Sequence, residues 1–210
     1  MKILKFGGSS VKTTERIERV VQLISSEHPC GVVISAFGGI TDQLIQLIAC
    51  AERGADYNND LQFFFDRHRK TIHNLHLEKE ILFSTVQKIE DELGVTLSTI
   101  TNQKKCTPQL KDAALSVGER LSANIITEAC IEKGIYAAYL DARKVILTDD
   151  HFGSAFVHYQ KSYNNIRNEW KDESKTRIIT GFIGATESGE TTTFGRSGSD
   201  YTASIFGAAL

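Results

Sequence analysis

The chain opens with Met1-Lys2-Ile3-Leu4-Lys5-Phe6-Gly7-Gly8-Ser9-Ser10-Val11, a short apolar run that two glycines interrupt. The residues Ile3 to Phe6 predict a buried strand, and the glycines, which have no Cβ atom, let the backbone turn sharply after it. Lys5 adds a positive charge at that turn, and a helix expected near Thr13 points its first amides to the same place. This pattern suits a phosphoryl group, although a glycine pair alone is equally typical of a plain strand-to-helix connection.

A second strand and a second glycine turn follow. The continuous β-branched run Gly31 to Ser35 predicts a strand buried on both faces of a parallel sheet, and the helix before it completes a βαβ unit. The turn Ala36-Phe37-Gly38-Gly39 then leads into a helix from Thr41 or Asp42 to Arg53. Both glycine turns therefore lie at the carboxyl edge of the sheet, where open α/β sheets bind ligands.

The middle of the chain is predicted to be helical. Apolar spacing from Asp60 to Gly94 indicates a helical hairpin inserted between sheet elements, followed by a connector from Thr96 to Thr107. Pro108 starts another helical region, and its amphipathic helix from Leu121, ended by Gly134, places Glu119 in or just before the first turn of that helix. There Glu119 is either a carboxylate favoured by the helix dipole or one that faces a ligand amine.

The last third combines short strands with a glycine-rich loop. Strands are predicted at Tyr136 to Leu140, Val145 to Leu147 and Arg177 to Gly181. Arg196 lies in the loop that follows, between glycines and hydroxyl residues, and Asp200 is expected to cap the final helix. An arginine in a glycine loop that opens onto a helix N-terminus is an anion site by its chemistry.

Composition excludes several classes of function. The chain has 210 residues, 41% of them hydrophobic, which is enough for one domain or two small ones. A net charge of -2 gives no basic surplus to attract nucleic acid or an anionic membrane. No apolar run approaches a membrane span, no signal peptide precedes the first strand, and four scattered cysteines favour free thiols. We expect a cytoplasmic protein that binds neither nucleic acid nor membranes.

No metal site is expected. His68, His73 and His76 lie within one helical region, but no cysteine or suitably spaced carboxylate joins them. The common phosphate-binding signatures, Gly-x4-Gly-Lys-Ser/Thr and Gly-x-Gly-x-x-Gly, do not occur in the chain. Phosphate, if bound, is held by a different scaffold.

Five motifs in order resemble those of aspartokinases, which belong to the amino-acid kinase superfamily. They are Lys5 to Val11, Ser35 to Leu44, Ser116-Val117-Gly118-Glu119, Leu140-Asp141-Ala142-Arg143, and the segment from Gly181-Phe182-Ile183-Gly184 through Asp200-Tyr201-Thr202-Ala203. The resemblance runs the whole length of the chain. It implies an α/β fold, a three-layer αβα sandwich with a mainly parallel sheet, truncated here and with a helical insertion around residues 60–130. Ser197 departs from the family pattern, which has a glycine there.

The resemblance also implies an activity: transfer of the ATP γ-phosphoryl group, with Mg²⁺ bound to the ATP, to the side-chain carboxylate of L-aspartate. The product is 4-phospho-L-aspartate, the first step toward lysine, threonine and methionine. Carried over motif by motif, the resemblance makes Lys5 and Asp200 the catalytic residues. The ATP phosphates would be bound by Lys5, Phe6, Gly7 and Gly8. The aspartate site is then formed by Ser35, Thr41, Glu119, Arg196 and Ser199. We expect Lys5 and Arg196 to share one pocket.

The apolar helix that ends at Ala208-Ala209-Leu210 has no polar cap. We therefore expect residues 1–210 to be the amino-terminal, aspartate-binding part of a longer kinase, with little activity alone and with a homo-oligomer left open for the complete enzyme. Two alternatives remain: a related kinase acting on acetylglutamate, glutamate or a nucleotide monophosphate, and a non-catalytic ligand-binding module of the same fold. Glu119 together with Arg196 favours a free amino acid, which carries both an ammonium and a carboxylate.

Overall fold

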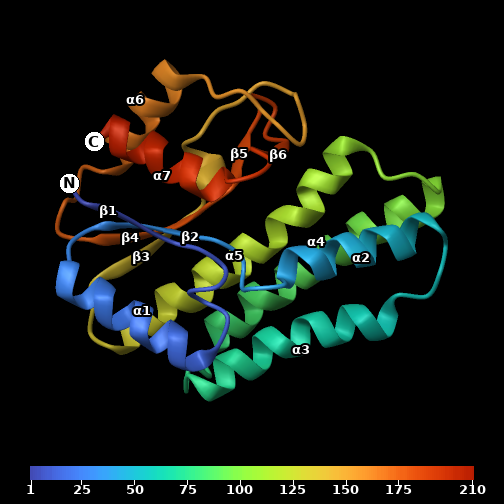
Figure 1. Cartoon of the computed structure of the whole chain (residues 1–210), viewed down its shortest axis with the longest axis horizontal. Helices are drawn as coiled ribbons and strands as arrows, with labels where there is room; N and C mark the ends of the chain where they lie inside the picture. The colour runs from blue at the N-terminus through green and yellow to red at the C-terminus, as the bar shows by residue number, and fades with distance from the viewer.

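A four-stranded parallel sheet forms the centre of the computed structural model, which describes all residues 1–210 (Figure 1). Its spatial order is β1-β2-β4-β3, and the strands are β1 (Ile3–Phe6), β2 (Gly31–Ile34), β4 (Thr176–Thr180) and β3 (Ala137–Leu140). A separate antiparallel ribbon pairs β5 (Ile183–Ala185) with β6 (Thr191–Thr193). Because all four central strands are parallel, their carboxyl ends meet along one edge.

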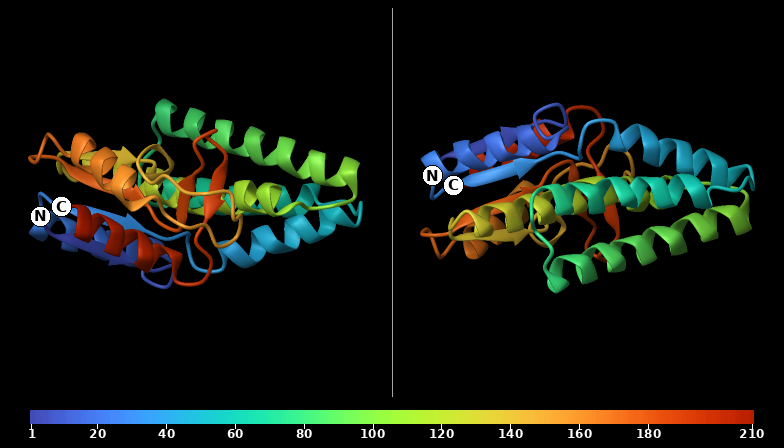
Figure 2. Two further views of the ribbon diagram at one scale, coloured as in Figure 1. Left: turned by 90° about the horizontal axis from the view of Figure 1, so that it is seen from above. Right: turned by 90° about the horizontal axis from the view of Figure 1, so that it is seen from below.

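Helices cover both faces of this sheet, which confirms the three-layer αβα arrangement. Figures 1 and 2 show one face covered by α1 (Thr14–Glu27) and α5 (Pro108–Glu132), the other by α6 (Tyr159–Glu169) and α7 (Gly198–Ala209). Side chains alternate along each strand, so Val32 and Ile34 join the core beneath α1 and α5. Val33 points the other way, into a second core with Trp170 and Phe206.

Three further helices extend beyond the sheet (Figures 1 and 2): α2 (Ile40–Glu52), α3 (Asn58–Asn74) and α4 (Glu80–Gln103). The antiparallel pair α3 and α4 is the helical hairpin expected from the sequence, and both helices direct their buried apolar side chains into the larger core. The third helix of the 60–130 region, α5, also packs on the sheet and so belongs to the sandwich itself. No helix of the chain combines the length and the apolar character that a membrane crossing requires.

The predicted connector from Thr96 to Thr107 is wrong over most of its length. Helix α4 continues to Gln103, because Leu97 and Ile100 extend its buried stripe by a further turn. The next helix begins at Pro108, where the Thr107 side chain accepts a hydrogen bond from the Leu110 N–H at 3.2 Å. Glu119 therefore lies in the middle of α5, and its interpretation as a helix-terminal carboxylate is wrong.

Two smaller predictions are also wrong. The strand expected at Val145 to Leu147 is absent, since a short 3-10 turn precedes it and only Leu147 forms an isolated bridge, to Ala185. Asp200 does not cap the final helix: α7 begins at Gly198, after Ser197 at the cap position, and Asp200 lies in its first turn.

Gly118 is predicted to tolerate no side chain. A Cβ atom there would lie 2.8 Å from the Ala36 Cβ and 2.9 Å from the Ile40 Cγ2. Gly118→Ala should therefore lower the free energy of unfolding by about 1–3 kcal/mol through overpacking. The matched control is Gly94→Ala, also inside a helix but with nothing within 4 Å of its Cβ position. That variant should raise stability by about 0.5–1 kcal/mol. Urea denaturation measures both, and equal effects of the two substitutions would contradict the close packing.

Candidate active site

A cavity of about 260 Å³ lies at the carboxyl edge of the sheet and brings together residues from both ends of the chain. The first and second glycine turns, helix α5 and the loop before α7 all contribute to its wall. Among the predicted site residues, those that line it are Lys5, Gly8, Ser35, Thr41, Glu119, Ser199 and Asp200. Phe6 and Gly7 do not line it: the Phe6 side chain packs against the apolar core, and Gly7 lies beneath the Lys5 amine.

Lys5 and Asp200 close the site by joining the two ends of the sequence. The Lys5 Nζ lies 2.9 Å from the Asp200 Oδ1, with the lysine side chain 25% exposed and the aspartate side chain 61% exposed. Lys5 comes from β1, whereas Asp200 comes from the first turn of α7. The pair holds the amine over Gly7, whose Cβ position is 3.5 Å from the Nζ. A cation is thus fixed at the cavity wall.

The two glycine turns pack backbone against backbone. A Cβ atom on Gly8 would lie 2.9 Å from the Ala36 carbonyl oxygen, and one on Gly38 would lie 3.0 Å from the Gly8 oxygen. The N–H groups of residues 7–9 and 37–39 donate to no acceptor within the protein. The N-cap residues of helices α2 and α7, Gly39 and Ser197, also lie here. Unpaired amides, two helix N-termini and one amine together make a cradle for an anion.

Glu119 rises into the cavity from the middle of α5. It is only 5% exposed, and this burial raises the pKa of its carboxyl from 4.5 to about 8. Its Oε1 accepts a hydrogen bond from the Ala36 N–H at 3.2 Å. One turn further on, the Ser122 hydroxyl donates to the Ser35 carbonyl at 2.8 Å. Helix α5 therefore supports the second glycine turn and presents a carboxyl group that an ammonium ligand can pair with.

Arg196 lies in an adjoining cavity of about 710 Å³, not in the one that holds Lys5. The two cavities share Thr41, Phe182 and Gly195 as walls, so they meet side by side. Both neighbours of Arg196 adopt positive φ angles, +71° at Gly195 and +59° at Ser197. The loop therefore turns back on itself and leaves Arg196 exposed. The expectation of a single pocket for both cations is corrected to two connected ones.

The departure of Ser197 from the family pattern has a structural consequence. Its φ of 59° and ψ of 18° fall in the left-handed region, which glycine adopts freely and serine does not. Ser199, two residues later, is buried against the end of β4, where a Cβ on Gly181 would lie 2.6 Å from its Oγ. The loop before α7 is thus held in a strained path on one side and by close packing on the other.

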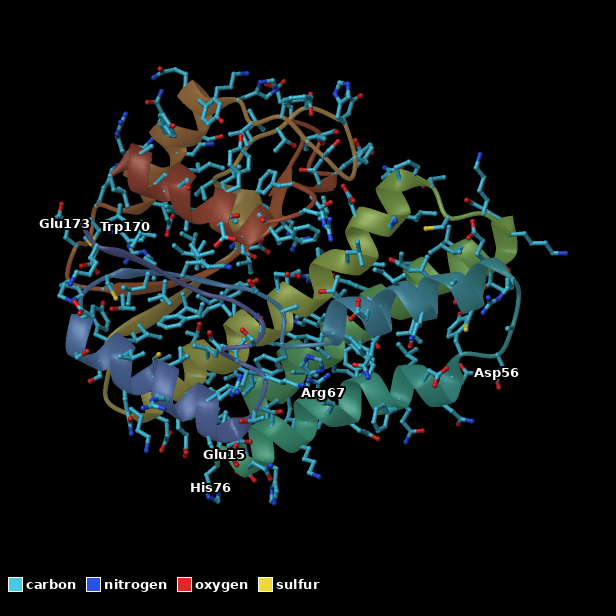
Figure 3. The ribbon with its side chains drawn as sticks, viewed as in Figure 1. Glu15, Asp56, Arg67, His76, Trp170 and Glu173 are labelled. Carbon is cyan, nitrogen blue, oxygen red and sulfur yellow. The ribbon has the colours of Figure 1, made fainter.

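Sequence reasoning missed two residues that shape the site. Asp112 is 1% exposed and accepts three hydrogen bonds of 2.8 Å, from the Gly153 N–H and from the N–H and hydroxyl of Thr193. It ties α5 to β6 just before the glycine-rich loop, and burial raises its pKa. Its position seven residues before Glu119, on the same helix face, is the one signal that could have found it. Arg67 of α3 is the second, and Figure 3 shows it reaching toward the turn between β2 and α2.

The histidines considered as metal ligands have other partners. His68 is fully buried, stacks on Phe37 and donates its Nδ1–H to the Phe64 carbonyl, and burial lowers its pKa to about 4. His73 pairs with Glu78 on the surface. No group of three His, Cys, Asp or Glu side chains is placed to hold a metal ion.

Comparisons with known proteins identify the family. The amino acid kinase family model matches residues 1–210. The chain is 30% identical to aspartokinase 1, chloroplastic, of Arabidopsis thaliana, over 99% of its own length and 38% of the relative. It is 32% identical to the aspartokinase of Chlamydia muridarum, over 98% of its length and 44% of the relative. The chain thus spans less than half the length of these relatives.

Solved structures give the same result. Escherichia coli aspartokinase III in complex with aspartate and ADP (R-state) superposes with a TM-score of 0.87 at 28% identity, covering 100% of this chain and 47% of that one. The same enzyme in complex with lysine and aspartate (T-state) gives a TM-score of 0.90, again at 28% identity and with the same coverage. With the family model matching from the first residue to the last, this chain belongs to the amino acid kinase family.

Proposed function

We propose that this chain is the aspartate-binding part of an aspartate kinase, which transfers the ATP γ-phosphoryl group to the β-carboxylate of L-aspartate. The observation that carries the proposal is the cavity where Lys5, the unpaired amides of both glycine turns and Glu119 meet. The names of the relatives, and the aspartate and ADP bound by the E. coli enzyme, support the choice of substrates. The product, 4-phospho-L-aspartate, would enter lysine, threonine and methionine synthesis.

The arrangement suits the electrostatics of this reaction. A carboxylate that attacks a triphosphate brings two anions together, so the protein contributes mainly positioning and positive charge. Lys5 and the free N–H groups near Gly8 and Gly38 supply that charge without reorganising during the reaction. Mg²⁺ enters as part of the ATP substrate and neutralises the phosphates further. Asp200 holds the Lys5 amine in place and is the exposed carboxylate at the rim of the cavity.

L-Aspartate fits across the junction of the two cavities. Its ammonium would pair with Glu119, which lines one cavity, and its α-carboxylate with Arg196, which lines the other. The β-carboxylate would then lie near Lys5, with the hydroxyls of Ser35, Thr41 and Ser199 around it. An amino acid is favoured over acetylglutamate because an acetylated nitrogen offers no positive charge to Glu119.

The remaining parts of the proposal reach beyond these residues. We infer that the chain is the amino-terminal part of a longer kinase whose other half binds the nucleoside of ATP. The chain spans less than half the length of the curated relatives, which supports this division. The cytoplasmic location and any homo-oligomer stay predictions from the sequence.

Lys5→Met tests the proposal in the protein at its full length. The turnover number should fall by about 10²–10³, because a preorganised positive charge at the reacting phosphoryl group is lost. The affinity for L-aspartate, measured by calorimetry, should stay within about twofold, since other groups hold the amino acid. Lys2→Met is the control, because Lys2 pairs only with the surface residue Glu27. ATP-dependent release of ADP measures turnover. Undiminished turnover in Lys5→Met, or a preference for acetylglutamate or glutamate, would overturn the assignment.

Glu119→Gln tests the raised pKa of the buried carboxyl group through the pH dependence of stability. Between pH 4.5 and about 8 the folded protein keeps a proton on Glu119 that the unfolded chain releases, so the wild type loses stability as pH rises through this range. The variant keeps the acceptor for the Ala36 N–H but carries no titrating group, so this loss should disappear. Urea denaturation at about pH 5 and about pH 9 measures it, with Glu132→Gln on the same helix as control. Identical pH dependence in Glu119→Gln and wild type would refute the raised pKa.

The same variant should also bind L-aspartate more weakly. Pairing with an ammonium requires the ionised carboxyl, so L-aspartate affinity of the wild type should rise with pH toward about 8. Glu119→Gln should bind L-aspartate about 10-fold to 10²-fold more weakly, with no such rise, because a charge-assisted hydrogen bond becomes a neutral one. Calorimetry across the pH range measures both effects. An unchanged affinity would remove Glu119 from the ammonium site.

A further inference from the structure

The helical hairpin reaches the site through Arg67. This residue lies on α3, well away from the sheet, yet its Nη2 donates to the Gly38 carbonyl oxygen at 2.6 Å (Figure 3). Its Nη1 lies 3.4 Å from the Gln43 Oε1 on α2. Arg67 itself does not line the cavity, whereas Gly38 and Gly39 do. The guanidinium therefore contacts the second glycine turn without entering the ligand space.

The hydrogen bond fixes the direction of one peptide group. In a trans peptide the N–H points opposite to the C=O, so holding the Gly38 carbonyl toward α3 turns the Gly39 N–H the other way. That N–H has no acceptor within the protein. Gly39 has a φ of +86°, and glycines on both sides of the peptide leave it free to adopt other orientations. A contact such as the Arg67 hydrogen bond is therefore needed to hold the Gly39 N–H in one direction.

A second contact from the same helix supports the same turn. His68, the next residue, is fully buried and stacks on the Phe37 ring, with centroids 5.4 Å apart and an angle of 16° between planes. Gly38 in turn packs on Gly8 of the first turn. Two successive residues of α3, Arg67 and His68, thus contact the second glycine turn. That turn packs against the first glycine turn.

We propose that Arg67 is a positioning residue for phosphoryl binding: it aims the Gly39 N–H into the cavity and polarises that peptide with its positive charge. A cation bonded to the carbonyl makes the N–H of the same peptide a stronger donor. The role rests on the proposed function, in which the cavity takes the phosphates of ATP. It gives the α3–α4 hairpin a part in the chemistry although no residue of the hairpin lines the cavity.

The test compares Arg67→Met with Arg69→Met in the protein at its full length. Arg69 lies on the same helix and pairs with Asp66 and Glu90, without contact to the glycine turn. Arg67→Met should weaken the binding of tripolyphosphate, measured by calorimetry, about tenfold, and raise the KM for ATP similarly. The KM for L-aspartate should stay within about twofold in both variants. Arg67→Lys, which keeps a charged donor, should recover most of the lost affinity.

A general loosening of the hairpin would affect both arginine variants alike and both substrates alike, and either result would overturn the proposal. Amide NMR gives a measurement that needs no variant: the Gly39 N–H of the wild type should shift when tripolyphosphate is added, and an unmoved resonance would also overturn it. If the wild type binds tripolyphosphate and ATP while Arg67→Met matches it, only this inference fails. If the wild type binds neither, the proposed function fails with it.

Discussion

Gly8 and Gly38 lie so close that neither position has room for a Cβ atom, and the site depends on this backbone contact. It arises because β1 and β2 are parallel neighbours in register, Phe6 beside Ile34, so their carboxyl ends reach the same edge together. Each strand then has to turn away at once, and the two turns face each other with their amides unpaired. A side chain at either glycine would push the two turns apart and disturb the arrangement of their amides.

Charge is distributed unevenly around this contact. Lys5 supplies a fixed cation, and two helix N-termini add partial positive charge beside it. Glu119 is the buried acid of the cavity, and burial favours its neutral form until a cation approaches. Arg196 stands in the adjoining cavity, exposed to solvent. One end of the combined space thus favours phosphate, while the other offers the pair of charges that a free amino acid needs.

The parts predicted well are those with local signals. The opening strand, the β-branched strand at Gly31 and the glycine turns each show their structure within a few residues. The length of α4 was missed because threonines and serines interrupt the apolar stripe that ends at Ile100. Asp112 and Arg67 were missed for a different reason: their partners, Gly153, Thr193 and Gly38, belong to segments far away in the sequence. The path of Arg196 depends on the φ angles of its two neighbours, which composition does not encode.

Helix α5 holds three segments that are far apart along the chain. Glu119 and Ser122 bind the turn after β2, while Asp112 binds both Gly153 and Thr193. Each of these segments has local structure of its own, and its hydrogen bonds to α5 fix it relative to the other two. Displacing α5 would therefore release all three regions together, so this helix links the separate walls of the pocket.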